Sequence, residues 1–222
     1  MIGFPGSPKL QKGALLSLDP NDARVKPILV FQYNPESLSR SIQGSAAGDA
    51  TGHGAEQRLS GPPTETISLD AELDATDQME VAAPGVPALG IYPALSSLEL
   101  LMYPSSEAAQ RNELLMAGGK LEIIPLPQPL TLLVWGPRRV LPVRLSEFSI
   151  TEEGYDPALN PIRAKVRLSM RVLTYQDLGL RSQGGTLFMG HHILKESLAA
   201  QYQGSVAGVL SQLLGAPLPG GR

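Results

Sequence analysis

The stretch from Ile162 to Thr174, IRAKVRLSMRVLT, decides the fold because apolar and charged side chains alternate along its length. One face carries the apolar residues Ala164, Val166, Leu168, Met170 and Val172. The other face carries Arg163, Lys165, Arg167, Ser169 and Arg171. Successive side chains of a β-strand point to opposite faces of the sheet, so this pattern predicts a half-buried strand with one basic side.

A second alternating stretch, TISLDAELD from Thr66 to Asp74, is the acidic counterpart of this basic strand. Its polar face includes three carboxylates: Asp70, Glu72 and Asp74. Two interpretations of the basic face stay open: a solvated strand surface, or ion pairs with an acidic face such as this one, within the sheet or across a subunit boundary. Exposed ion pairs contribute roughly 0 to 1 kcal/mol each, so their value would lie in register and orientation.

Length and composition indicate a β-rich globular protein. The 222 residues include 20 prolines and 23 glycines, which fall between the patterned runs and predict many short strands joined by turns. The absence of cysteine excludes disulfides and thiolate metal sites. A formal net charge of -3 argues against general nucleic-acid binding. No segment has the pattern of a signal peptide or a membrane span, so we expect folding in the cytoplasm.

Further strands and helices can be placed along the chain. Strands are expected at 13–18, 28–33, 36–43, 121–124, 130–135 and 140–151, the last with a bulge near Glu147 and after a turn at 135–138. A helix is expected within 89–103 to cover the sheet, and another at 106–116. Residues 186–203, with Leu187, His191, Leu194, Leu198 and Tyr202 near one face, predict a third, followed by a weaker helix at 206–214. Residues 44–63 contain little to bury and predict a mobile loop.

Enzyme chemistry has little support in the sequence. His191 and His192 are neighbours, so on a helix they point about 100° apart and do not hold one metal ion together. The acidic pairs Asp70 with Glu72 and Glu152 with Glu153 lack a visible pocket that would shift a pKa for acid-base catalysis. The basic strand lacks the aromatic side chains that stack on nucleic-acid bases. We therefore expect a non-enzymatic protein without cofactor or metal.

Several separated motifs resemble the tube and tube-initiator proteins of contractile injection systems, which are phage-tail-like particles of bacteria. Phe31, Tyr33, Asn34 and Pro35 form the first motif. Further similarity follows at 62–69, at 95–103, at Trp135 and Gly136, and at 148–152. It ends with Tyr155, Asp156 and Pro157 leading into Arg163. The resemblance covers roughly Leu15 to Leu173, with the motifs in the family's order.

This resemblance implies a structural subunit that forms six-fold rings. The implied fold is mainly β, with two packed antiparallel sheets as a sandwich or barrel, a flanking helix, and a C-terminal helical extension. Residues 1–178 would form the β domain and residues 179–222 the extension. Those family members that belong to the baseplate often carry a C-terminal LysM domain. The sequence pattern of that domain is missing after Thr174.

The role expected from the resemblance is a baseplate hub or tube initiator that joins the inner tube to the spike and baseplate. Its partners would be copies of itself, the inner-tube protein, and spike and baseplate components, with assembly into a particle that can be released from the cell. No nucleic-acid partner and no direct membrane insertion are expected. An ordinary inner-tube subunit and a peptidoglycan-binding module are the alternatives. Candidate contacts between subunits or with the tube lumen are Arg163, Lys165, Arg167, Arg171, Asp70, Glu72 and Asp74.

Overall fold

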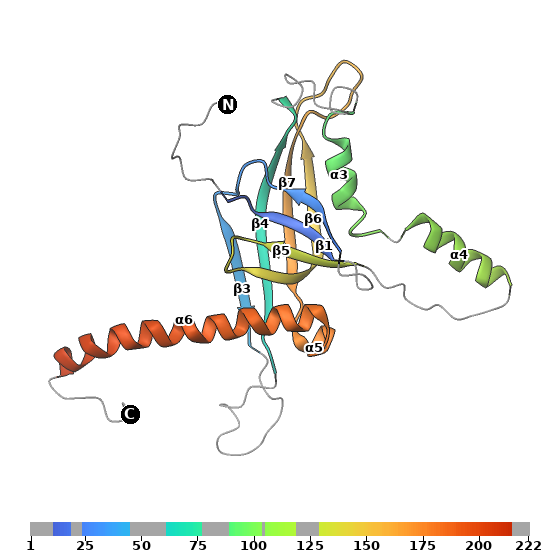
Figure 1. The fold of residues 1–222 in the computed structure, drawn as a ribbon. Coiled ribbons are helices and arrows are strands. Elements are labelled where there is room, and N and C mark those ends of the chain that lie inside the picture. Colours follow the sequence, from blue (N-terminus) through green and yellow to red (C-terminus); the bar gives the residue numbers. More distant parts are fainter. Residues whose placement is uncertain are drawn as a thin grey trace.

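A computed structural model describes residues 11–18, 24–44, 61–76, 89–103, 105–118 and 129–214. Its strands are β1 (Ala14–Leu18), β2 (Val25–Val30), β3 (Leu38–Gln43), β4 (Thr64–Asp74), β5 (Leu130–Val134), β6 (Val140–Glu152) and β7 (Arg163–Val172). Its helices are α3 (Tyr92–Glu99), α4 (Ser106–Ala117), α5 (Tyr175–Leu178) and α6 (Gln183–Leu214). Figure 1 shows the strands crossing at the centre, with α3 beside them and α6 across one end.

The mainly β prediction is confirmed, but the described strands form one open sheet instead of two separate sheets. Their order is β2-β1-β5-β6-β7-β4-β3, and each neighbouring pair is antiparallel. The long strand β6 explains the difference, because residues 140–143 pair with β5 whereas residues 143–152 pair with β7. The two expected groups of strands are thereby joined by hydrogen bonds into a single sheet.

The bulge that the sequence predicts near Glu147 is present in β6. The register against β7 shifts between Leu145 and Glu147, and a bulge of this kind bends a strand and increases its twist. The turn at 135–138 is also confirmed, because the Trp135 amide donates to the Arg139 carbonyl at 2.8 Å and Gly136 has a φ of 73°. Glycine adopts that φ without the steric cost of a Cβ atom, so this residue fits the position.

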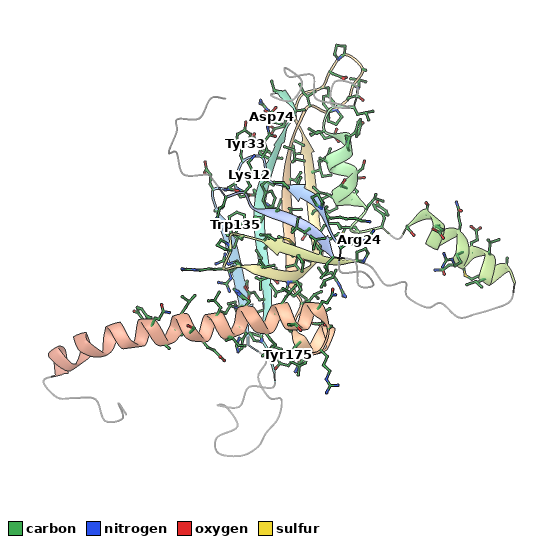
Figure 2. All side chains as sticks on the ribbon, viewed as in Figure 1. Lys12, Arg24, Tyr33, Asp74, Trp135 and Tyr175 are labelled. Atoms are coloured by element: carbon green, nitrogen blue, oxygen red, sulfur yellow. The ribbon has the colours of Figure 1, made fainter. Side chains whose placement is uncertain are left out.

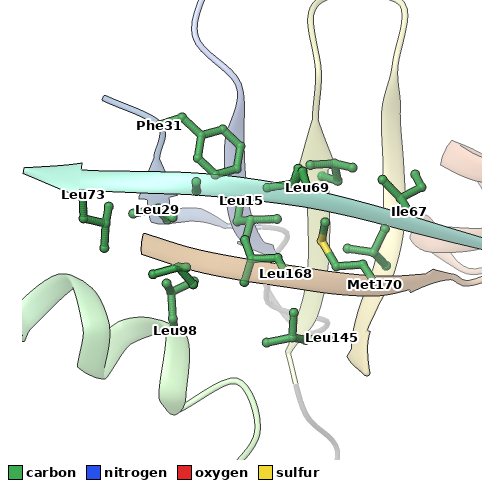
Figure 3. Close-up of a cluster of buried hydrophobic side chains, with 14 of the residues drawn as sticks. Leu15, Leu29, Phe31, Ile67, Leu69, Leu73, Leu98, Leu145, Leu168 and Met170 are labelled. Atoms are coloured by element: carbon green, nitrogen blue, oxygen red, sulfur yellow. The ribbon is translucent and has the colours of Figure 1, made fainter. Parts of the chain in front are cut away.

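One core contains the inner faces of both halves of the sheet together with α3. Figure 3 shows Leu15 of β1, Leu29 of β2, Leu69 of β4, Leu168 of β7 and Leu98 of α3 in this core. The alternation that defines β4 and β7 continues into the structure, since every apolar position of β7 is buried and every basic position is exposed. Burial of one face fixes the register, because a slip of one residue would expose that entire face.

The strand boundaries differ from the sequence predictions mainly at β2. We expected a strand at 28–33, whereas β2 spans Val25–Val30 and passes through Pro27. Proline is tolerated there because β2 is an edge strand, which has hydrogen bonds on one side only. The predicted strand at 121–124 and residues 45–60 of the predicted loop lie outside the described residues.

The helices follow the predicted positions with one correction at the C-terminal end. α3 packs Leu95 and Leu98 into the core, and α4 spans the predicted region. The two helices expected at 186–203 and 206–214 are one continuous helix, α6. The first part of α6 packs on the sheet: Phe188 is buried and Leu187, His191 and Leu194 are half-buried, whereas Leu198 and Tyr202 are exposed.

Candidate assembly surface

The exposed face of β4 and β7 brings the acidic and basic strands of the sequence side by side. The register places Asp70 opposite Arg167, Glu72 opposite Lys165 and Asp74 opposite Arg163. Pairing within the sheet, one of the interpretations left open above, is therefore the arrangement that the structure contains. Cross-strand neighbours of opposite charge favour this register and disfavour its alternatives.

Four ion pairs form a row along this face, which we call the charged ladder. Arg167 Nε lies 2.8 Å from Asp70 Oδ1, and Arg163 Nη2 lies 2.8 Å from Asp74 Oδ2. The remaining two pairs are Lys165 with Glu153 at 2.9 Å and Arg171 with Asp177 at 2.8 Å. Figure 2 shows Asp74 near one end of the sheet and Tyr175, two residues before Asp177, near the other end. The ladder therefore follows the long strands.

Two partners in the charged ladder differ from those that strand alternation suggests. Lys165 contacts Glu153 beyond the end of β6 instead of its cross-strand neighbour Glu72. Arg171 contacts Asp177, whose position depends on the short helix α5. Neither contact follows from the pattern of one strand, because Glu153 and Asp177 both lie beyond the ends of the strands.

The ladder lowers the pKa of its aspartates. The hydrogen bond from Arg167 holds the pKa of the Asp70 carboxyl below its usual range. For Asp74, partial burial would raise the pKa, but hydrogen bonds from Thr76 and Arg163 outweigh it and the pKa is lowered. Asp177 behaves in the same way, since hydrogen bonds from Thr174 outweigh its desolvation and the pKa falls. At neutral pH this face is consequently a mosaic of paired charges of both signs.

The first motif of the family resemblance holds β1 against the β5–β6 hairpin. Phe31 is 1% exposed, and its ring meets Trp135 edge-on with centroids 6.2 Å apart. Asn34 accepts a hydrogen bond from the Gly13 amide at 2.9 Å and donates to the Gln11 carbonyl at 2.8 Å. The contacts of Phe31, Asn34 and Trp135 are structural, whereas Tyr33 is 52% exposed and Pro35 is half-buried.

The last motif of the resemblance, at Tyr155 to Pro157, shapes the loop between β6 and β7. Asp156 Oδ1 accepts hydrogen bonds from the amides of Ala158 and Asn160, each at 2.8 Å. The pKa of Asp156 is lowered, chiefly by the hydrogen bond from the Asn160 side chain and also by these two amides. The loop then presents the Pro161 carbonyl to the amide of Ile91, 2.9 Å away, at the start of α3. This motif therefore positions the helix that closes the core.

Sequence reasoning missed a buried carboxylate at the junction of three elements. Glu65 of β4 is 5% exposed and lies 2.6 Å from Arg40 Nη2 of the edge strand β3. Its second oxygen lies 3.4 Å from Lys195 Nζ of α6. The signal in the sequence was a single glutamate on the apolar face of β4, in the position before Ile67 on that face. A buried carboxylate requires a cationic partner, and two are supplied from segments far apart in the chain.

The sheet is open at both sides, and its two edges differ. β2 carries Pro27, which removes one backbone donor, whereas β3 contains no proline. β3 pairs only with β4, so its other side has no partner strand within the described part of the chain. Ile42 of β3 is also 55% exposed. A strand edge of this kind is a template for pairing with another chain.

Two further searches cover the described residues only. No group of three or more histidine, aspartate or glutamate side chains among them is arranged to hold a metal ion. Among the same residues, no helix has the length and apolar character needed to span a membrane.

Comparisons with known proteins gave matches to solved structures alone. No protein-family model matches the chain. No curated protein matches it in sequence. A chain in the virion of a native gene transfer agent particle is similar over 72% of this chain and 90% of that chain, with 10% identity and a TM-score of 0.27. A chain in the tail of an empty gene transfer agent particle, refined with C6 symmetry, has the same coverage and identity with a TM-score of 0.28.

Proposed function

We propose that this protein is a structural subunit of a phage-tail-like contractile injection system. The single observation that carries the proposal is the open sheet, whose unpaired β3 edge is suited to continuing the sheet into a second copy. An edge that joins a different edge of the next copy gives a head-to-tail contact, and such contacts generate rings when the rotation closes. The motif resemblance supports a ring of six.

The finer role that we propose is a baseplate hub or tube initiator that joins the inner tube to the spike and baseplate. The protein acts here by shape and contact, without catalysis. In this role one ring is present per particle, whereas an ordinary inner-tube subunit would form many stacked rings. Copy number per particle, measured by quantitative mass spectrometry against the spike protein, separates these two roles.

The charged ladder would then face the tube lumen or an adjoining ring. Arg167 and Asp70 remain 72% and 64% exposed in their side chains although they are paired, so they stay available to charged groups of another surface. Because these charges are already paired within one subunit, they would add little to the affinity between subunits and would act mainly on how the two surfaces are oriented. Reversal of Arg167 and Arg171 to glutamate should disturb assembly of the particle while the subunit remains folded. Normal particles from this variant would remove the ladder from the assembly contacts.

The ring is tested by analytical ultracentrifugation and negative-stain electron microscopy of the purified protein. We expect six-fold rings in equilibrium with the monomer, and a shift toward monomer in Ile42→Lys, because a charge on an edge strand opposes strand pairing. Leu159→Lys is the matched control, since Leu159 is an exposed apolar residue in the loop between β6 and β7. A wild-type protein that stays monomeric at every concentration, with or without the inner-tube protein, would overturn the proposal.

A further inference from the structure

The first half of α6 packs on the subunit, and the second half projects away from it. Figure 1 shows α6 crossing the end of the sheet and continuing past β3. Lys195 is half-buried, and the seven residues that follow it, Glu196 to Tyr202, are exposed. Lys195 contacts Glu65, whose cross-strand neighbour is Ile42 of the edge strand. The helix therefore leaves the body at the open β3 edge.

The charge pattern of the sequence changes at the same place. Lys195 and Glu196 are charged, but no residue from Ser197 to Leu214 is, in a chain with 18% charged residues. A helix that projects into water is normally polar around its circumference, so a charge-free helix indicates burial against another protein surface. At 1.5 Å per residue the charge-free segment is about 27 Å long. Neighbouring strands lie about 4.8 Å apart, so this length would cross about five to six strands of a sheet.

The apolar stripe on this segment continues the stripe that already packs on the sheet. Leu187 and Leu194 are half-buried on their own subunit, and Leu198 is four residues beyond Leu194 on the same helix face. Tyr202 follows after four more residues, yet Leu198 is 40% exposed and Tyr202 is 71% exposed. One helix face thus begins on the core of its own subunit and extends beyond the edge of that subunit.

We infer that the distal half of α6 packs on a second copy of this chain, namely the copy that joins at the β3 edge. This inference rests on the ring proposed above. The occupant follows from the position of the helix, because α6 leaves the body beside that edge and a copy paired there is the first surface it meets. The helix lies across the end of its own sheet, so it would continue across the end of the neighbouring sheet.

The salt bridge to Glu65 lies where the projecting part of α6 leaves the body of the subunit. Glu65 binds Arg40 of the edge strand and Lys195 of α6 at once, so one buried carboxylate links the edge to the point where the helix departs. The edge contact and the helix contact are therefore held in a fixed relation. A neighbouring copy would be gripped at two places by elements that the same carboxylate orients.

The test uses full-length protein with a photo-crosslinking residue, p-benzoylphenylalanine, in place of Tyr202. We expect irradiation of the ring to give a covalent dimer, with the cross-linked peptide in a second copy, as shown by mixing isotope-labelled and unlabelled protein. Cross-links confined to one chain would overturn the inference. A ring that forms no cross-link between copies at Tyr202 would overturn it as well.

Paired substitutions on the two faces of α6 test the contact energetically. Leu198→Asp and Tyr202→Asp each place a charge on the apolar stripe, and we expect at least a tenfold rise in the subunit concentration needed for rings. Ala200→Asp is the matched control, because Ala200 is exposed and lies two residues, about 200°, from both positions around the helix. Equal effects at all three positions, or no effect at any, would overturn the inference.

The outcome for the ring itself separates the two proposals. If the wild-type protein forms rings and Leu198→Asp forms them equally well, the helix contact fails while the proposed function stands. If the wild-type protein forms no rings under any condition tested, the proposed function fails and this inference fails with it.

Discussion

Gly13 shows how a single residue controls the contact between β1 and the aromatic pair. A Cβ atom at this position would lie 2.8 Å from Phe31 Cδ2 and 2.9 Å from Trp135 Cε3. The two rings also pack against each other, and Phe31 is almost fully buried. Phe31 has little room to move, and Trp135 is half-buried, so a Cβ at this position would force at least one of the two rings to shift.

Gly13→Ala should therefore lower the free energy of unfolding by about 1 to 3 kcal/mol, the usual cost of overpacking a core. Urea denaturation followed by Trp135 fluorescence measures this change, since Trp135 is the only tryptophan. Gly44→Ala is the control, because a Cβ at Gly44 meets nothing within 4 Å. Equal stability of the two variants would show that the aromatic pair yields without cost.

The buried carboxylate of Glu65 is the second feature at the residue scale. Arg40→Met should lower the free energy of unfolding by about 2 to 4 kcal/mol, because removal of one partner leaves a buried charge poorly compensated. Lys195→Met should cost less, since its nitrogen lies at 3.4 Å compared with 2.6 Å for Arg40. Thermal and urea unfolding measure the stability of both variants and of the double variant Arg40→Met with Glu65→Gln, each compared with the wild type. If the added Glu65→Gln restores no stability, the uncompensated charge is not the cause.

At the scale of single elements, the charged ladder gives β4 and β7 a dependence on pH. The pKa of Asp74 and of Asp177 is lower in the folded protein than the usual value of about 4. A carboxyl whose folded-state pKa is depressed adds stability above its unfolded-state pKa, and this stability is lost as the pH falls through the folded-state pKa. The ladder thus contributes at neutral pH and fails in acid.

Asp74→Asn should accordingly be less stable than the wild type at pH 7, and the difference should shrink as the pH falls below about 4. Thermal unfolding measured at intervals between pH 7 and pH 2 follows this convergence. Asp70→Asn, on a side chain that is 64% exposed, should show a smaller effect because water screens the pair. A difference between Asp74→Asn and the wild type that stays constant over this range would contradict the lowered pKa.

The elements that the sequence predicts well are those whose burial repeats with a clear period. β4 and β7 alternate at every position, so their faces could be predicted, while the pairing of residues such as Asp70 with Arg167 was one of two interpretations that the sequence left open. β2 lies three residues before its predicted position and passes through Pro27, and its place at the edge of the sheet, which tolerates proline, is not visible in its own residues. Contacts such as Glu65 with Lys195 join residues 130 positions apart, and no local pattern specifies them.

The organisation of the whole molecule into one sheet also lies beyond local pattern. Short strands separated by turns fit two packed sheets as well as one curved sheet, and the choice depends on β6 pairing with β5 and β7 in succession. Three residues of the family motifs lie where elements of this sheet meet: Asn34 bonds to Gly13 just before β1, Gly136 lies in a hairpin turn, and Asp156 lies in the loop before β7. These residues fix contacts between elements within the subunit, whereas the exposed sheet edges and α6 are the features available for contacts with other subunits.

At the scale of the whole molecule, α6 should have two halves with different effects on stability. Phe188 is 9% exposed and packs its ring against Tyr175 with centroids 6.0 Å apart, so Phe188→Ala should cost about 3 kcal/mol in the free energy of unfolding. Leu198→Ala should change the monomer by less than about 0.5 kcal/mol, since Leu198 lies on the projecting half. Urea unfolding at concentrations where the protein is monomeric measures both. A large loss in monomeric Leu198→Ala would mean that the distal half folds back on its own subunit, and the helix would then be internal support instead of an arm toward the next copy.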